Sequence, residues 1–216
     1  MSKENVEIVR SMYKTVNGKL LDPMTFADPP LAAAWRHRDA RDGFEVAFLR
    51  QTQGGHHLDG CTSAVEEHQA WAVQYSIVVD TKWQTQNARV TGRSVAGARE
   101  LTIETNGPGI WLVNGEAAPA LDGCLDVDLE ASALTNALPV RRLALRVGQE
   151  ADAPAAYIRA LDLSVERLEQ RYVRLENDGQ HERYHYASPA FELEAELVYD
   201  EFSLVLDYPG IASRVA

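Results

Sequence analysis

The chain has 216 residues, a formal net charge of −11 and a composition that is 45% hydrophobic and 25% charged. This composition is typical of a soluble globular protein, and the acidic surplus disfavours a nucleic-acid binder, which needs excess lysine and arginine. No apolar run approaches the roughly 20 residues that span a bilayer, and the first residues lack the apolar core of a secretory signal. We therefore expect a cytoplasmic protein with no integral membrane segment and no nucleic-acid partner.

The N-terminal region differs in pattern from the rest of the chain. Between residues 4 and 20, apolar side chains recur at spacings of three and four, which predicts an amphipathic helix. A stretch with Pro23, Pro29 and Pro30 follows, and such punctuation is typical of a linker. We predict a helical appendage and linker over residues 1–30 and one β domain over residues 31–216.

From residue 34 onward, short alternating runs are broken by glycine, asparagine and aspartate, which predicts β-strands. Asn114-Gly115 predicts a two-residue hairpin turn. In the strand predicted over 44–50, the apolar side chains of Phe44, Val46 and Phe48 are expected to face the interior. The expected fold is mainly β: a single curved antiparallel sheet, of the spiral-roll or half-open-barrel kind, with an N-terminal helix. The predicted strands are 34–38, 44–50, 56–66, 70–79, 83–91, 99–105, 110–113, 125–129, 143–146, 155–162, 166–175, 182–187, 192–198 and 202–208.

The stretch 121–130 is the most informative part of the sequence. A turn signal at Asp122-Gly123 leads into strict alternation, so that a strand would carry Asp126, Asp128 and Glu130 on one face. Three interpretations stay open. The acids form the solvent face of an antiparallel strand, or they line a concavity with nearby arginines and accept hydrogen bonds from sugar hydroxyls. The third is a calcium site, although the usual loop spacing is absent.

This stretch and the one that follows, 135–143, resemble the signature block of a bacterial family named "putative glycolipid-binding". Further matches are Ala156-Tyr157-Ile158-Arg159, Glu169-Gln170-Arg171-Tyr172, Leu206-Asp207-Tyr208-Pro209-Gly210, and Trp83 after a strand ending in Asp80. The resemblance covers roughly residues 33–212, so the N-terminal helix lies outside it. It implies a spiral β-roll, a curved sheet around an apolar interior, similar in shape to bacterial lipoprotein carriers.

The resemblance further implies that an amphipathic, glycolipid-like molecule is bound without chemical change. Such a ligand requires an apolar groove for its chains and a polar mouth for its head group. Arginine suits phosphate or carboxylate, and aspartate and asparagine suit hydroxyl groups. The predicted ligand-binding residues are Asp122, Asp126, Asp128, Asn136, Arg141, Arg142, Tyr172 and Trp83.

Two alternatives stay open beside this interpretation. The chain could be a small hydrolase or isomerase with Asp126 or Asp128 as base, or a structural module whose cavity is filled by its own side chains. No nucleophile elbow, zinc-protease motif, phosphate-binding loop or paired cysteine motif occurs in the sequence. We therefore expect no cofactor and no metal site and assign no catalytic residue. The sequence does not indicate an oligomeric state.

Overall fold

The computed structural model describes residues 26–39, 41–66, 68–107 and 109–216. The helix predicted over residues 4–20 lies outside these ranges. Within them, no helix combines the length and apolarity needed to cross a membrane.

The described chain is dominated by β-strands, with one α-helix and three short 3-10 helices. The first part contains β1 (Ala32–His37), β2 (Asp42–Thr52), β3 (Gly55–Glu66), β4 (Gln69–Asp80), β5 (Thr85–Ser94), β6 (Gly97–Thr105), β7 (Trp111–Val113) and β8 (Glu116–Ala117). The middle contains η1 (Pro119–Leu121), β9 (Asp126–Leu129), η2 (Leu134–Asn136), α2 (Ala137–Leu143), β10 (Glu150–Asp152), β11 (Ala155–Ile158) and β12 (Val165–Leu168). The last part contains β13 (Arg171–Arg174), β14 (Glu182–Ser188), η3 (Pro189–Phe191), β15 (Leu193–Tyr199), β16 (Val205–Tyr208) and β17 (Ala212–Arg214).

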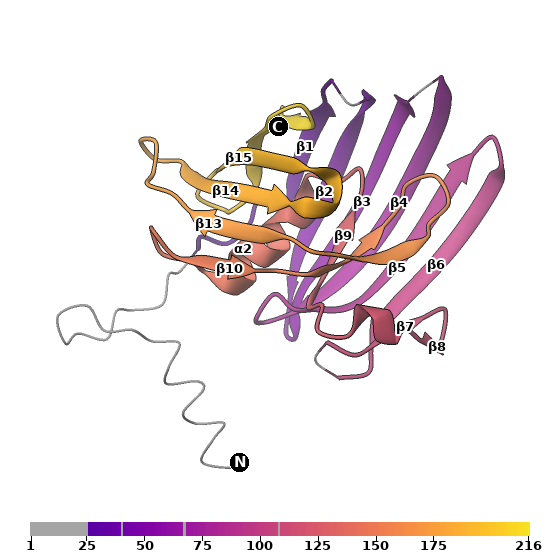
Figure 1. The fold of residues 1–216 in the computed structure, drawn as a ribbon. Coiled ribbons are helices and arrows are strands. Elements are labelled where there is room, and N and C mark those ends of the chain that lie inside the picture. The colour runs from indigo at the N-terminus through magenta and orange to yellow at the C-terminus, as the bar shows by residue number, and fades with distance from the viewer. Residues whose placement is uncertain (1–25, 40, 67, 108) are drawn as a thin grey trace, which may run out of the picture.

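Fourteen strands form one antiparallel sheet in the order β10-β13-β14-β15-β16-β17-β1-β2-β3-β4-β5-β6-β7-β8. The C-terminal strand β17 pairs with β1, which joins the two halves of the chain edge to edge. Strands β1 to β6 form one wall, and the sheet curves so that β13 to β15 pass over α2 (Figure 1). This open, curved antiparallel sheet confirms the mainly β prediction.

The prediction of a single sheet was wrong, because three strands form a second sheet in the order β12-β11-β9. Its β9 pairs with β11 in parallel, with Asp126 opposite Ala155. Parallel strands are usually buried on both faces, and β9 follows this rule, since Asp126, Val127 and Leu129 are all buried. The segment predicted as one strand over 166–175 is in fact divided between the two sheets.

The prediction for β2 was wrong in its orientation. Phe44 and Phe48 are 39% and 55% exposed, and Glu45 and Leu49 are buried. Both faces of this strand carry apolar residues, so alternation alone does not identify the inner one. Because side chains alternate, choosing the wrong face reverses every residue of the strand.

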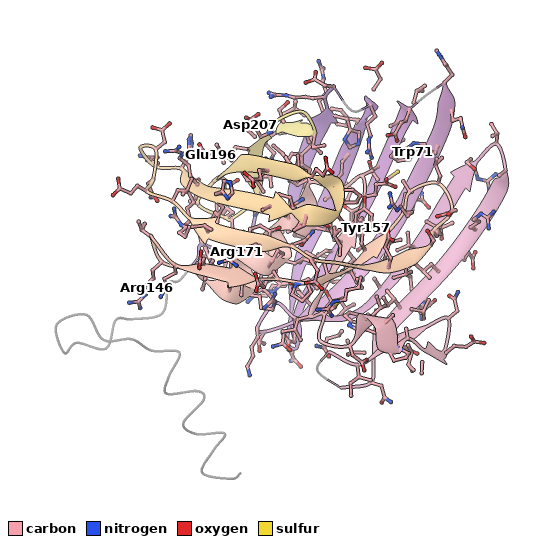
Figure 2. All side chains as sticks on the ribbon, viewed as in Figure 1. Trp71, Arg146, Tyr157, Arg171, Glu196 and Asp207 are labelled. Carbon is pink, nitrogen blue, oxygen red and sulfur yellow. The ribbon has the colours of Figure 1, made fainter. Side chains whose placement is uncertain are left out.

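Side chains fill the space between the wall β1 to β6 and the opposite layers. Trp71 on β4 belongs to this core, whereas Tyr157 on β11 packs against Phe191 of η3; both Trp71 and Tyr157, which Figure 2 labels, are buried. The largest side chains with less than 2% exposure are Trp35, Trp111, Tyr172, Tyr184 and Tyr199. Cores of this kind are close-packed, so at these positions the sheet encloses aromatic side chains rather than an open groove.

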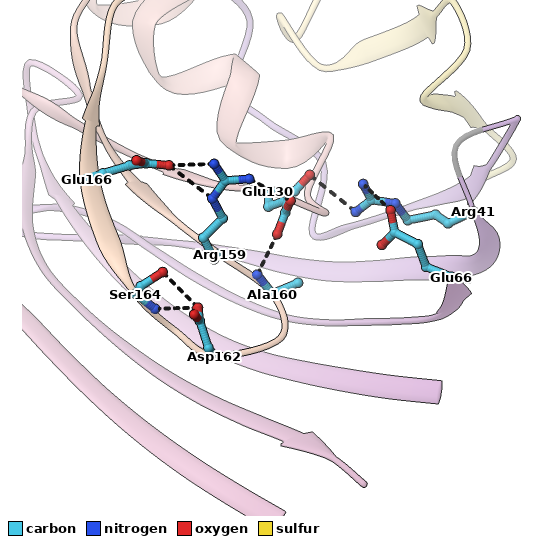
Figure 3. A network of polar contacts seen from close by, with 8 residues as sticks. All are labelled: Arg41, Glu66, Glu130, Arg159, Ala160, Asp162, Ser164 and Glu166. Carbon is cyan, nitrogen blue, oxygen red and sulfur yellow. Dashed lines mark hydrogen bonds and ion pairs between the residues drawn. The ribbon is translucent and has the colours of Figure 1, made fainter. Parts of the chain in front are cut away.

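Charged residues tie one end of the small sheet to the wall (Figure 3). Glu130, directly after β9, accepts hydrogen bonds from the Ala160 amide at 2.7 Å and from Arg159 at 3.4 Å. Arg41 donates to the Glu130 carbonyl and lies 3.6 Å from a carboxylate oxygen of Glu66. Glu130 therefore bonds within the protein and does not face solvent as a free acid.

Two local predictions had different outcomes. The turn at Asn114-Gly115 is confirmed, since both residues have positive φ and Val113 pairs with Glu116. The strand predicted over 143–146 was wrong, because Leu143 ends helix α2. That helix is short, and Pro139 lies in its first turn, where its missing amide hydrogen breaks no helical bond.

Candidate ligand-binding site

The turn between β4 and β5 forms a structured rim at one end of the large sheet. Asp80 ends β4, and its Oδ1 accepts hydrogen bonds from the amides of Lys82 at 2.8 Å and Gln84 at 3.0 Å. These bonds close the turn and place Trp83 at a φ of +63°, a region that non-glycine residues seldom adopt. Such local strain persists only where the surrounding structure fixes it.

A cavity of about 260 Å³ opens at this rim. Most of its lining is polar and comes from the β4–β5 turn, from β5 and from the end of β6, with backbone from the following loop. The lining residues are Asp80, Gln84, Thr85, Gln86, Thr105, Gly107, Gly109 and Leu125. The carboxylate and two amide side chains offer the donors and acceptors that hydroxyl groups require.

Part of this lining is held in place by bonds within the protein. Thr85 is buried, and its Oγ1 accepts a hydrogen bond from the Val127 amide at 3.2 Å. The Thr85 amide donates to the carbonyl of Leu125 at 3.0 Å. Strand β5 is therefore fixed to the segment that leads into β9, so the signature block forms one side of the cavity.

The loop after β6 reaches the same segment through two glycines. The Gly123 amide donates to the carbonyl of Gly109 at 2.8 Å. Gly109 has a φ of +71°, and a Cβ at this position would lie 3.1 Å from the Cα of Gly123. Only glycine allows this backbone approach without strain. Asp122, beside Gly123, has an exposed side chain, and its carbonyl accepts a hydrogen bond from Arg167.

On the inner side of the same turn, the Trp83 indole lies between two other groups. The His56 ring stacks on one face, with 4.4 Å between centroids and 26° between planes. The Arg141 guanidinium also contacts the indole, 4.4 Å from its centroid, a cation–π geometry. The predicted ligand-binding residues Trp83 and Arg141 are therefore in contact, although 58 positions separate them in the sequence.

The predicted residues Asp126 and Arg142 form a buried ion pair. Arg142 Nη2 lies 2.6 Å from Asp126 Oδ2, and Nε lies 3.0 Å from Oδ1. Burial raises the pKa of Asp126, and the Arg142 guanidinium opposes that rise. The pair joins α2 to β9 and uses both carboxylate oxygens.

Asp128, Asn136 and Tyr172 belong to a second set of internal contacts. Asp128 accepts hydrogen bonds from Thr135 at 2.8 Å and from Gln170 at 2.6 Å. Burial raises the pKa of Asp128 to about 6. The Tyr172 hydroxyl donates to Asn136 Oδ1 at 3.3 Å, and neither residue is exposed.

The structure therefore divides the predicted residues into three groups. Trp83 and Arg141 lie at the inner side of the rim, and Asp122 lies outside beside the loop of the cavity. Asp126, Asp128, Asn136, Arg142 and Tyr172 bond to one another or to neighbouring residues inside the protein. Asp126 and Asp128 do not line the rim cavity, so neither acid, although burial raises its pKa, is placed to act on a molecule in that cavity.

Four residues were not predicted from the sequence: Gln84, Gln86 and Thr105 at the cavity, and the buried acid Glu45. Glu45 accepts hydrogen bonds from Tyr75 at 2.7 Å, from Ser132 at 2.5 Å and from the Ala133 amide at 2.7 Å. The sequence signal for Glu45 is a single carboxylate among the apolar residues of a predicted strand. If such a carboxylate is buried, it needs hydrogen-bond partners inside the protein. The sequence signal for the cavity is weaker: it is the turn that contains Asp80, which lines the cavity, and Trp83.

Among the described residues, no group of three or more histidine, cysteine, aspartate or glutamate side chains could hold a metal ion. The fold and the rim cavity define a mainly β protein with a large open sheet and a small polar cavity at one end.

This chain belongs to the family described as "Putative glycolipid-binding", whose model matches residues 32–214. It is similar to the crystal structure of a DUF1089 family protein from Pseudomonas aeruginosa, with 32% identity, a TM-score of 0.69, and coverage of 91% of this chain and 100% of that chain. It is also similar to a β-barrel-like protein of the DUF1849 domain from Brucella abortus, with 8% identity, a TM-score of 0.48, and coverage of 87% and 97%. No curated protein matched.

Proposed function

We propose that this protein binds an amphipathic, glycolipid-like molecule without chemical change, and that the rim cavity receives the polar head group. The observation that carries the proposal is a polar cavity of about 260 Å³ beside the signature block of the family. Its volume is just below the roughly 300–1,000 Å³ of pockets for drug-sized ligands. That size suits a single head group rather than a whole lipid.

The chemistry of the lining supports the same ligand class. Gln84 and Gln86 offer amide groups, and Asp80 accepts both hydrogen bonds of its turn with Oδ1, so we assign Oδ2 to the ligand. Hydroxyl-rich rings need donors and acceptors of this kind. Ile110, on the loop after β6, is 51% exposed and gives an apolar surface beside the cavity for the start of an alkyl chain.

The packing of the interior decides where the alkyl chain goes. Trp35, Tyr172, Tyr184 and Tyr199 occupy the enclosed space and are at most 2% exposed. We therefore assign the acyl part to the outside of the rim, where Ile110 lies, and the head group to the cavity.

Calorimetric titration with octyl β-glucoside below its micelle concentration tests this proposal. Gln84→Ala and Gln86→Ala should each weaken binding about fivefold, because each removes about one hydrogen bond. Gln74→Ala is the matched control, since Gln74 is an exposed glutamine on β4 away from the cavity. Absence of binding, or equal weakening by Gln74→Ala, would refute the proposed site.

Native mass spectrometry of the purified protein, followed by organic extraction, tests the ligand class directly. A bound glycolipid or acyl species at one molecule per chain, reduced in the Gln84→Ala and Gln86→Ala double variant, is the expected result. Equal retention by that double variant would place the bound lipid elsewhere.

A further inference from the structure

The segment Phe26–Pro30, here called the N-terminal strap, lies before the part of the chain that matches the family model. It nevertheless contacts Arg141 of helix α2. The Phe26 ring centroid lies 5.5 Å from the guanidinium carbon of Arg141, and the Ala27 carbonyl accepts a hydrogen bond from Arg141 Nη2 at 2.8 Å. A segment that precedes the residues matched by the family model thus bonds directly to a residue of the signature block.

Arg141 is buried, with 8% exposure, yet it forms none of the ion pairs found among the described residues. Its Nε and Nη2 donate to the carbonyl of Phe202 at 3.0 and 2.5 Å. Burial lowers the pKa of Arg141 to about 10, so the side chain stays charged at neutral pH. A buried guanidinium without a contacting carboxylate is costly.

His56, which lies beside Arg141 at the Trp83 ring, also lacks a hydrogen-bond partner for one ring nitrogen. His56, which stacks on Trp83, is 9% exposed, and its Nδ1 is buried with no hydrogen-bond partner. Asp28, on the strap, is exposed, and its carboxylate acts electrostatically on His56 and, after Asp200 and together with Glu182, on Arg141. The strap therefore brings an aromatic ring, a carbonyl oxygen and a carboxylate to one cationic and aromatic site.

We propose that Arg141, Trp83 and His56 form a binding site for the anionic group of an amphiphile, and that the strap occupies this site in place of the ligand. The Ala27 carbonyl takes the position of one ligand oxygen, Asp28 supplies the negative charge, and the Phe26 ring covers the guanidinium as an apolar chain would. Arginine binds carboxylate and phosphate with two parallel hydrogen bonds, which is stronger than the single bond that it makes to Ala27.

This inference deepens the proposed function, because it adds a charged ligand class and a self-occupied subsite on the inner side of the same rim turn. The strap, residues 26–30, lies before β1 and belongs to no strand of the sheet. A ligand must displace the strap, so the strap lowers the apparent affinity by the fraction of molecules in which the site is free.

The test weakens the strap in the full chain. Dodecyl phosphate, below its micelle concentration, is titrated by calorimetry into wild type and into the double variant Phe26→Ala/Asp28→Asn. We expect at least tenfold tighter binding to the variant. The matched control is Phe44→Ala/Asp42→Asn, which changes the same residue types at the same spacing on exposed positions of β2. Equal affinity for wild type and strap variant, or the same gain in the control, overturns the inference.

Changes in the site itself complete the test. Arg141→Gln added to the strap variant should remove the gain, and His56→Ala serves the same purpose if the Arg141 variant does not fold. Retention of the gain in a folded site variant overturns the inference. Inorganic phosphate separates the two sources of an anion: binding comparable to dodecyl phosphate supports a site for the free anion, and binding of dodecyl phosphate alone supports a lipid head group.

The neutral probe separates this inference from the proposed function. Octyl β-glucoside should bind wild type and strap variant equally, because its site is the rim cavity. If it binds neither while dodecyl phosphate still gains affinity in the strap variant, the rim-cavity proposal fails and the anion site stands. The reverse pattern removes the anion site and leaves the cavity.

Discussion

The guanidinium of Arg142 contacts both carboxylate oxygens of Asp126, which lies 16 positions earlier in the chain. The Asp126 side chain is 1% exposed and that of Arg142 is 11% exposed, so little water screens the pair. It fixes the only α-helix of the described residues to the parallel strand of the small sheet.

Arg142→Ala should therefore destabilise the protein strongly. It leaves a buried carboxylate without its partner, and such losses cost about 3–5 kcal/mol. Urea unfolding measures the change. The control Arg171→Ala removes ion pairs to Glu150 and Asp152 at exposed positions and should change stability little. Similar effects of the two substitutions would contradict a structural role for the buried pair.

Asp128→Asn should change how stability depends on pH. Because burial raises the pKa of Asp128 from 3.8 to about 6, the folded protein binds this proton more tightly than the unfolded chain does. The stabilisation is present below about pH 4 and is lost as pH rises to 6. The wild-type advantage over the variant should thus fall by at most about 3 kcal/mol across that window. A difference independent of pH, measured by urea unfolding, would contradict the shift.

Gly109→Ala should cost more stability than Gly115→Ala. Both glycines have positive φ, which costs an alanine about 1–2 kcal/mol. Only at Gly109 does a new Cβ also meet a backbone atom, the Cα of Gly123, whereas nothing lies within 4 Å at Gly115. Thermal unfolding compares the two. The Gly109 variant should also bind octyl β-glucoside more weakly, because Gly109 lines the cavity; equal stability of both variants would argue against a tight backbone contact.

Glu45→Ala should release the segment that follows the small sheet. The substitution leaves Tyr75, Ser132 and the Ala133 amide without their acceptor, and each unsatisfied buried group costs about 1–3 kcal/mol. Hydrogen exchange should show faster exchange at Ala133. Glu45→Gln keeps one acceptor oxygen and should cost less. If the alanine and glutamine variants are equally stable, the three hydrogen bonds are not what holds this acid in the core.

These contacts show which parts of the structure were accessible from the sequence. The strands β3 to β6 were predicted closely, because long alternation bounded by turns is a strong local signal. The Asn114-Gly115 turn was equally local, since its residues alone favour positive φ. Such features depend on the backbone preferences of a few neighbouring residues.

The features that failed depend on distant partners. Asp126 and Asp128 were predicted to bind a ligand, and nothing in the sequence shows that Arg142 and Gln170 bond to them inside the protein. Helix α2 was missed because seven residues that include Pro139 and Val140 carry little helical signal. The stack of His56, Trp83 and Arg141 joins three separate elements, and only the folded chain brings them together.

The lengths of the outermost strands have a consequence for association. At one end of the fourteen-stranded sheet lies β10 with three residues, and at the other lies β8 with two. A sheet that does not close into a barrel keeps two edges whose free amides and carbonyls can recruit strands from other molecules. Here each edge offers so few of these groups that an added strand would gain few hydrogen bonds. The sheet therefore resists aggregation through its edges, although it does not close into a barrel.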